Sequence, residues 1–298
     1  QGKKETLTIK DVVFRIAPRI NAAGRMKHGL HAVNLLTEEN LDTALQFAAE
    51  IEVYNSDRKD ADKSITQKAL SQILDNKEED KYTTVVYEED WHKGVIGIVA
   101  SRLTETYYRP TLVFTKSGEK LAASARSVKG FDVYNALEAC ADYIEQFGGH
   151  KYAAGLTLLE NQYQAFKQKF EEVVATTIDK KLMIPEIEVD MAIELSQITP
   201  KFHRILKQFA PYGPGNMAPV FMTNGLTDTG YAKCVGAEEK HLKCKVQKQQ
   251  IAIGGIGFNL GKKYELLSDR KHFKAAYTIE ENEWNGQVSL QLNLKDIN

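Results

Sequence analysis

The sequence predicts an α/β domain that is preceded by a long interdomain helix and followed by an all-β barrel. Three observations carry this prediction. A helical pattern runs from Leu41 to about Leu74, strands alternate with helices over residues 81–180, and short strands separated by turns follow Pro185. The expected domain ranges are 1–80 for the connecting segment and long helix, 81–182 for the α/β domain and 183–298 for the barrel.

The first eighty residues are expected to be irregular at first and then helical. Leu7–Ile16 is an apolar run that favours a strand without partners, residues 17–29 are predicted to be irregular, and Leu30–Leu36 favours a brief helix. The long helix that follows is apolar at both ends and almost wholly charged in its middle, which is typical of a bridge between two domains. Asp60 and Asp62 lie in this charged middle and are expected to face solvent.

The α/β domain and the barrel follow from shorter patterns. Pro110 ends a buried helix, and Asp132 suits the N-cap of the next one. In the α/β domain the predicted elements are strand Thr83–Glu88, helix Gly94–Thr106, hairpin strands Thr111–Thr115 and Leu121–Arg126, helix Asp132–Tyr143, strand Gly155–Leu159 and helix Gln162–Ile178. In the barrel they are strand Glu186–Leu195, helix Pro200–Phe209, a loop at Pro211–Asn216, and strands Val220–Met222, Lys243–Gln247, Ile251–Gly257, Phe273–Ile279 and Val288–Leu294.

Composition limits the class of protein. Apolar residues make up 43% of the 298 residues and charged residues 27%, as in ordinary soluble proteins. The absence of a signal peptide or an apolar run of ~20 residues predicts a cytoplasmic protein with no membrane partner. The net charge of −1 argues weakly against nucleic-acid binding, so any phosphate site must be local. Gln1 in place of a methionine indicates a piece of something longer.

The cysteines are better explained by packing than by metal binding. Their odd number suits a reducing compartment. Cys140 lies on an apolar stretch and is expected in the core. A zinc site built from Cys234, His241 and Cys244 would lack the four ligands in tight pairs that closed zinc sites have.

Two segments of the α/β domain combine residue types that suit phosphate. In Gly148-Gly149-His150 the glycines permit close approach to backbone N–H groups, and the histidine can donate a hydrogen bond or share a proton. In Ser124-Ala125-Arg126-Ser127 two hydroxyls accompany a planar guanidinium, and strand alternation places Ser124 and Arg126 on one face. The alternatives are a glycine pair that ends a helix and a polar strand edge.

Two further segments carry cations beside small or aromatic residues. Arg19 and Arg25 flank small residues that allow tight packing while both guanidiniums project, although a salt-bridged surface loop would look the same. Trp91 and His92 precede a helix whose N-terminus favours anions, although a lone tryptophan is more often a packing residue. No P-loop, dinucleotide fingerprint, nucleophile elbow or strand-end cluster of aspartates and histidines accompanies them.

Taken in order, these segments resemble the RecJ family of bacterial single-strand-specific 5′→3′ exonucleases, within the DHH phosphoesterase superfamily. The segments that match are PRINAAGR at Pro18–Arg25, WHKGVIGIVASRL at Trp91–Leu103, SARS at Ser124–Ser127, GGHKYAAG at Gly148–Gly155 and PYGPGN at Pro211–Asn216. They span essentially the whole chain in the family's order. The resemblance implies a DHHA1-type α/β domain, an oligonucleotide-binding (OB) barrel, single-stranded DNA as partner, and a role in DNA repair and recombination.

The resemblance also implies a site and its cofactor. In such enzymes an N-terminal DHH domain holds Mn²⁺ or Mg²⁺ across a cleft from DHHA1, and a metal-activated water attacks the phosphodiester. By matching position, His150 is the implied catalytic residue, and the implied nucleic-acid and phosphate ligands are Arg19, Arg25, Trp91, His92, Ser124, Arg126, Ser127, Gly148 and Gly149. The DHH domain is expected to be missing from this chain, so we expect no metal bound here and no activity of the chain alone.

Several points stay open at this stage. Candidate aromatics for stacking on DNA are Tyr231, Phe258, Tyr264 and Trp284, with no basis for choosing among them. A non-catalytic nucleic-acid-binding or scaffold protein could use the same two modules. A phosphodiesterase of the same superfamily for short oligonucleotides or cyclic dinucleotides is a second alternative, although such enzymes normally lack the barrel. A tRNA-editing domain is a more remote one.

Overall fold

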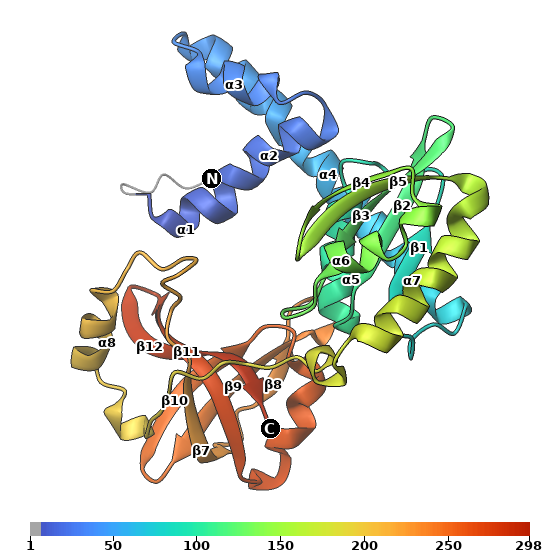
Figure 1. Ribbon diagram of the computed structural model, residues 1–298. Coiled ribbons are helices and arrows are strands. Elements are labelled where there is room, and N and C mark those ends of the chain that lie inside the picture. Colours follow the sequence, from blue (N-terminus) through green and yellow to red (C-terminus); the bar gives the residue numbers. More distant parts are fainter. Residues whose placement is uncertain (1–6) are drawn as a thin grey trace. The chain divides into compact units, whose positions relative to one another are not determined.

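The computed structural model describes residues 7–298, except for the side chains of residues 268–270 and of residue 284. The chain forms two compact units, divided between Pro185 and Glu186, and each is described by itself (Figure 1). The first is an α/β unit with a long helix before its sheet, and the second is a barrel of mixed strands, as the sequence predicts. None of the described helices is both long and apolar enough to cross a membrane.

The first unit begins with helices rather than a strand. Helix α1 (Ile9–Asp11), a π-helical segment (Val12–Ile16) and α2 (Ala17–Met26) follow one another directly, and α3 spans Leu30–Thr37. The predicted strand at 7–16 and the irregular segment after it are therefore wrong. The β-branched residues at 9, 12, 13 and 16 have helical spacing, and Thr8 forms a capping box with the third residue of the helix.

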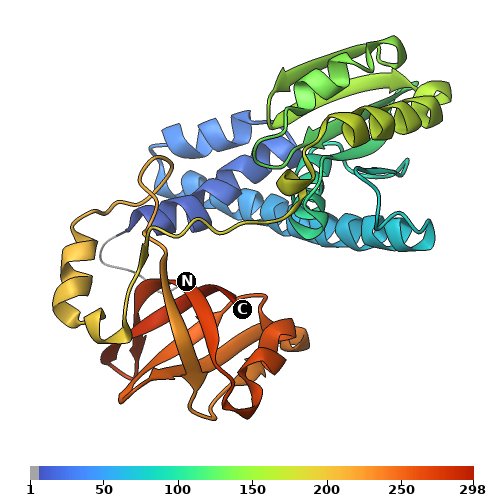
Figure 2. The same cartoon turned by 60° about the horizontal axis from the view of Figure 1, so that its bottom comes forward.

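Helix α4 (Leu41–Asp75) confirms the predicted long helix and is ~52 Å long at 1.5 Å per residue. Its first half packs on α2 and α3 around the buried side chain of Ile51, and its second half packs on α5 and the sheet (Figures 1 and 2). In its middle Asp62 is buried and not solvated as predicted, and Nε and Nη2 of Arg102 donate to its two carboxylate oxygens at 2.7 Å. This ion pair ties α4 to α5.

The sheet of the first unit has five strands in the order β1-β2-β3-β5-β4. Its strands are β1 (Thr84–Tyr87), β2 (Thr111–Ser117), β3 (Lys120–Arg126), β4 (Gln146–His150) and β5 (Ala153–Leu159). Strands β1 and β2 are parallel and the other pairs are antiparallel, so the predicted hairpin of β2 and β3 is confirmed. Strand β4 was not predicted, since its sequence contains an adjacent pair of glycines.

Helices cover the two faces of this sheet unequally. On one face α5 (Ile96–Tyr107) packs with α4 against β1–β3, and on the other α6 (Val133–Glu138) and α7 (Tyr163–Thr177) cover a larger core. Short 3-10 turns at Ala141–Tyr143, Glu160–Gln162 and Lys180–Met183 complete the unit. Asp132 caps α6 by accepting the Asn135 N–H, but the helix ends at Glu138, earlier than predicted. Because α5 stops at β3, the neighbouring β5 and β4 leave part of this face open.

The second unit is a closed barrel. Its strands are β6 (Met191–Ala192), β7 (Phe221–Asp228), β8 (Lys233–Val235), β9 (His241–Lys248), β10 (Ile251–Gly257), β11 (Phe273–Trp284) and β12 (Gln287–Ile297). The pairings β7-β11-β12-β10-β9 return to β7 through a β7–β9 contact, and β10–β12 is the one parallel pair in this ring. A five-stranded closed ring with this pairing is the OB architecture (Figure 2).

Two features around the barrel differ from the prediction. The strand expected at Glu186–Leu195 shrinks to β6, which pairs with β7 only at Met191–Phe221 and Ala192–Met222. Strand β8 and the 3-10 segment Gly261–Arg270 were not predicted. Helix α8 (Pro200–Lys207) and further 3-10 turns, at Leu195–Gln197 and Ala237–Glu239, complete the unit.

Candidate nucleic-acid interface

Strand register places the predicted phosphate residues of the first unit on one face of its sheet. Ser124 pairs with Gly155, which pairs with Gly148; likewise Arg126, Ala153 and His150 form one row across β3, β5 and β4. Residues that pair directly in an antiparallel ladder point to the same face. The alternate residues of β3 are buried in the core under α6 and α7, so the row of Ser124, Arg126 and His150 lies on the face that α5 partly covers.

Helices α2 and α5 bring a second arginine to this face. The first turn of α5 lies on β3 so closely that a Cβ on Gly97 would be 3.0 Å from both Arg126 Nη2 and Ser124 Oγ. Just before α5, a Cβ on Gly94 would be 2.1 Å from the carbonyl oxygen of Arg25, so only glycine permits this approach. Arg25 in turn donates a hydrogen bond to the Gly94 carbonyl at 3.3 Å. Sequence reasoning missed Gly97, although a glycine in a first helical turn was a visible signal.

This part of the surface has positive charge without a compensating carboxylate. Arg126 donates to Ser124 Oγ at 3.0 Å and to the Ala125 carbonyl at 2.7 Å, and Arg25 to the carbonyl described above. Among the residues whose side chains the structure describes, neither guanidinium forms an ion pair. Partial burial, and then the charge of Arg25, lower the pKa of Arg126. Two arginines that repel each other and retain free N–H donors can bind an anion such as a phosphate.

The glycine pair and His150 form the end of β4. His150 is exposed, and no hydrogen bond is formed by its imidazole within the described part of the chain. Gly149 has a φ of +153°, and a Cβ there would be 2.4 Å from the Ala153 carbonyl oxygen, so the strand can follow this path only with glycine. Gly148 and Gly155 have no side chains, and with the methyl group of Ala153 they leave a flat floor between His150 and the arginines.

Four predicted residues have local structural partners. Trp91 is 4% exposed and packs in the core with α4 and α5, so its prediction as a nucleic-acid ligand is corrected to a packing role. His92 is exposed, and its Nδ1 accepts the Gly94 N–H at 3.1 Å. Ser127 donates to the Phe131 carbonyl at 3.0 Å. Arg19 binds Glu52 of α4 through two nitrogens, which agrees with the salt-bridged alternative rather than with a free guanidinium.

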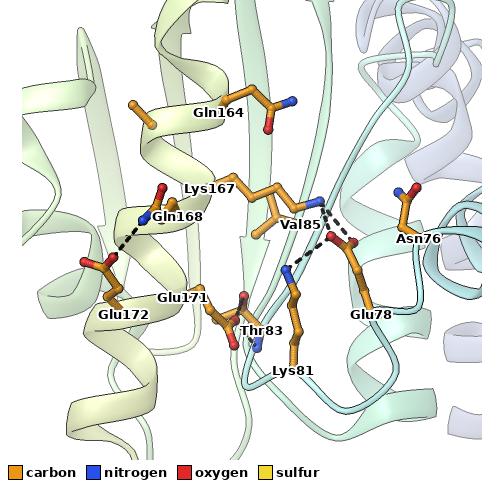
Figure 3. A pocket seen from close by; sticks show the side chains of 11 residues that line it. Asn76, Glu78, Lys81, Thr83, Val85, Gln164, Lys167, Gln168, Glu171 and Glu172 are labelled. Atoms are coloured by element: carbon orange, nitrogen blue, oxygen red, sulfur yellow. Dashed lines mark hydrogen bonds and ion pairs between the residues drawn. The ribbon is translucent and has the colours of Figure 1, made fainter.

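The cavity in Figure 3 lies elsewhere in this unit, between α7, β1 and the end of α4, and has a volume of about 680 Å³. Both of its lysines are paired with one glutamate. Lys167 and Lys81 point at the Glu78 carboxylate, at 2.9 and 3.5 Å (Figure 3). Glu171 accepts hydrogen bonds from the Tyr82 and Thr83 N–H groups, both at 2.9 Å. The polar groups that line the cavity therefore hold the segment before β1 against α7.

Metal ligands do not gather anywhere in the part of the chain that the structure describes: no group of three or more histidine, cysteine, aspartate or glutamate side chains could hold an ion. Burial raises the pKa of Cys140 to about 11 and that of Cys244 to about 12, which opposes the thiolate form that metals bind. Cys140 lies in the core as predicted. The chain's described residues therefore do not fit the Mn²⁺ or Mg²⁺ that the family resemblance implies.

The barrel exposes three of its four candidate aromatics. Phe258 is 57% exposed, Tyr231 46% and Tyr264 42%, whereas the side chain at Trp284 lies outside the described residues. Tyr231 lies under the Lys233 ammonium, 5.3 Å from ring centroid to nitrogen, and Phe258 contacts the His241 ring edge-on. Two of the exposed rings thus have cationic or imidazole neighbours, as single-strand binding surfaces do.

Comparison with known proteins finds two domain models and several similar proteins. The DHHA1 domain model matches residues 79–176, and the RecJ OB domain model matches residues 189–296. The single-stranded-DNA-specific exonuclease RecJ of Bacillus subtilis is 32% identical over 96% of this chain and 36% of its own length, and that of Escherichia coli is 31% identical over 98% and 52%. A crystal structure of RecJ with Mn²⁺ from Thermus thermophilus has a TM-score of 0.83 and 28% identity over 97% of this chain and 41% of its own. The chain thus spans about a third to a half of the curated relatives it matches.

Proposed function

Because this is a RecJ-like chain with a DHHA1 domain followed by a RecJ OB domain, we propose that it is the DNA-holding part of a metal-dependent 5′→3′ single-stranded-DNA exonuclease. The observation that carries the proposal is the convergence of Arg25 and Arg126 beside Ser124 without an ion-pairing carboxylate among the described residues. Phosphate is the ligand that two forked cations and a hydroxyl match best. The relatives named above are exonucleases specific for single-stranded DNA.

Each group at the site has a role in this proposal. Arg126 and Ser124 hold a terminal or neighbouring phosphate, and Arg25 adds a second positive charge. The bare glycine floor lets the sugar–phosphate chain lie close to the sheet. His150, at the far end of the row, donates a hydrogen bond to a non-bridging oxygen of the reacting phosphate. The barrel holds the rest of the single strand.

Hydrolysis requires groups beyond those described here. The ions that a metal-dependent phosphodiesterase uses generate its nucleophile and neutralise developing charge, and no cluster of ligands for them is present among the side chains that the structure describes. We propose that the intact protein supplies them from residues outside this chain, in a DHH domain. The chain alone is then expected to bind single-stranded DNA without cutting it.

The test combines fluorescence anisotropy with a gel assay for released nucleotide. A labelled single strand should bind weakly, bind better than a duplex, and dissociate as salt rises, with a log–log slope of about −2 to −3 if ~3–4 phosphates are neutralised. No nucleotide should be released with Mg²⁺ or with Mn²⁺. Cleavage by the purified chain would disprove the proposal that this chain lacks the catalytic centre. The absence of any salt-sensitive binding would disprove the proposal that it holds DNA.

His150 is tested in the intact enzyme. Replacing it with alanine should lower turnover by on the order of 10²-fold, as the loss of an oxyanion-type donor does. The melting temperature should hardly change, because the side chain is exposed and has no described hydrogen-bond partner. Normal turnover with a large fall in melting temperature would assign His150 to folding instead.

A further inference from the structure

The turn between β4 and β5 lies at the end of the row that contains the candidate phosphate residues. His150 of β4 pairs with Ala153 of β5, so only Lys151 and Tyr152 connect the two strands. Ala153 also pairs with Arg126 of β3. Tyr152 is therefore one residue away from the row that crosses these three strands.

The backbone of this turn is held by the segment that follows β3. The Tyr152 carbonyl accepts the Ser127 N–H at 3.1 Å, and the Lys151 carbonyl accepts the Val133 N–H at 3.0 Å. Both bonds come from chain that precedes β4, so the turn is anchored from outside its own strand pair. A ligand that contacts a turn fixed in this way loses little affinity to ordering it.

The Tyr152 side chain is 46% exposed. Its hydroxyl forms no hydrogen bond within the part of the chain that the structure describes. Tyr134 of α6 lies at the same end of the sheet but is packed, because its ring contacts the Phe147 ring at 5.3 Å between centroids. Tyr152 thus adds an aromatic surface that is open to solvent beside the row.

The neighbour of the Tyr152 ring is a cation. Lys151 Nζ lies 5.6 Å from the ring centroid, an arrangement in which the ring attracts the ammonium. Lys151 is exposed and forms no ion pair with any side chain that the structure describes. Because its ammonium is carried on a flexible four-carbon stem, it can leave the ring and follow a phosphate when another group stacks there.

We propose that Tyr152 stacks on one nucleobase of the strand whose phosphate is bound by Arg126 and Ser124, and that Lys151 binds the phosphate next to that base. Every base has a flat aromatic face, so this contact tolerates any sequence. A base inside a duplex is already stacked on both sides, so the contact also favours an unpaired strand. Tyr152 is then a positioning residue for the single strand. This inference rests on the proposed function and adds a base-contacting residue to its phosphate site.

The experiment is a double-mutant cycle between the tyrosine and the base, measured by fluorescence anisotropy with the full chain. Tyr152→Leu should weaken binding of an intact single strand by about tenfold, and Tyr152→Trp should restore it. Strands that lack one base, at each of the first four positions from the 5′ end in turn, identify the partner. At the position of that base, the unmodified chain and Tyr152→Leu should bind the abasic strand equally.

The salt dependence separates the ring from the lysine. Tyr152→Leu removes no charge, so the log–log slope of affinity against salt should be unchanged. Lys151→Ala should lower that slope by about 0.7, the value of one single-strand phosphate contact. An unchanged slope for Lys151→Ala would show that this lysine binds no phosphate and would overturn its part of the inference.

The matched control is Tyr82→Leu. Tyr82 precedes β1 and also lies beneath a lysine, with Lys180 Nζ 6.0 Å from its ring centroid, but it is in the segment that α7 holds. Its replacement should not change affinity for any of the strands. Circular dichroism and melting temperature establish that each variant is folded.

A structural role of Tyr152 would lower the affinity for intact and abasic strands by the same factor. Such equal losses at all four abasic positions, or equal losses in the Tyr82 variant, would overturn the inference and leave the proposed holding role intact. Undiminished binding of the intact strand by Tyr152→Leu would overturn it as well. Absence of binding by the unmodified chain would instead count against the proposed function itself.

Discussion

Two buried or half-buried arginines of the first unit differ in how their donors are used. Arg109 is 1% exposed, and it donates to the carbonyls of Glu78, Glu79 and Lys81 and to the Thr84 hydroxyl at 2.6–2.8 Å. Arg126 is only partly buried and donates to one hydroxyl and one carbonyl. Burial lowers the pKa of both arginines, so a pKa shift by itself does not separate them. The two arginines differ in how many of their N–H donors have a hydrogen-bond acceptor within the protein.

The same contrast holds between the cavity of Figure 3 and the open face of the sheet. The cavity has volume, but both of its lysines pair with Glu78, and Glu171 and Glu172 accept hydrogen bonds from neighbouring groups. The open face is not enclosed, yet it holds two cations that lack carboxylate partners within the described residues. Uncompensated charge, rather than enclosed volume, marks the candidate site in this molecule. Four substitutions test this distinction, from the largest expected effect to the smallest.

Arg109→Ala should lower the free energy of unfolding by about 3 kcal/mol or more, because three carbonyls and a hydroxyl would lose their donor inside the protein. Urea denaturation followed by circular dichroism measures this loss. Single-strand affinity, measured under conditions where the variant is folded, should be unchanged. A loss of stability below ~1 kcal/mol, the value of one ordinary hydrogen bond, would show that Arg109 does not hold the segment before β1.

Arg126→Ala should have the opposite profile. Stability should be unchanged or slightly higher, since repulsion with Arg25 is removed. Binding of a 5′-phosphorylated single strand should weaken by about 1.5–3 kcal/mol, the value of a charged hydrogen bond, and binding of the 5′-hydroxyl strand should weaken less. Anisotropy with the two matched oligonucleotides gives both numbers. Equal losses of affinity for the two oligonucleotides would show that Arg126 does not bind the terminal phosphate.

Gly97→Ala separates helix stability from binding. Alanine favours a helix by up to ~1 kcal/mol over glycine, but its Cβ would crowd Arg126 and Ser124 at 3.0 Å. We expect near-normal stability and binding weakened by about 1.4 kcal/mol, tenfold. Gly24→Ala in α2 is the matched control, since its Cβ would meet only Gly29 at 3.7 Å. Normal affinity of the Gly97 variant would place the phosphate away from α5.

Lys81→Ala should change little. The side chain is 45% exposed and lies 3.5 Å from Glu78, which keeps Lys167 at 2.9 Å. Exposed pairs contribute ~0.2–1 kcal/mol, so unfolding should shift by less than ~0.5 kcal/mol and single-strand affinity not at all. A measurable fall in affinity would make the cavity part of the binding surface and weaken the contrast drawn above.

The sequence predicted elements where one periodicity dominated. The long helix, the β2–β3 hairpin and the barrel strands β9 to β12 follow from patterns that local geometry imposes. The segment 7–16 was not predicted correctly. Its β-branched residues are typical of strands by composition, but their spacing is that of a helix. Strand β4 was missed because glycine has no preference that marks a strand. The helix over 7–16 is favoured by the local capping box of Thr8, whereas β4 depends on its pairing with β5.

The candidate site was partly predictable for a similar reason. Alternation along β3 placed Ser124 and Arg126 on one face, and the structure brings them together. Whether an arginine is free or paired depends on another element, so nothing local distinguished Arg19, which binds Glu52, from Arg25, which binds no carboxylate in the described chain. Trp91 is a case of the same kind, since its burial depends on α4.

The close approach of the Arg25 carbonyl to Gly94 also bears on the order of folding. The two guanidiniums come from α2 and β3, with the whole of α4 and α5 between them in sequence. Such distant contacts form only after the intervening chain has closed, so a partly folded unit could have its sheet and Arg126 without Arg25. A ligand that needs both arginines then binds only the fully docked form and stabilises it by mass action. Under the function proposed above, single-stranded DNA is such a ligand and would stabilise the docked form of this unit.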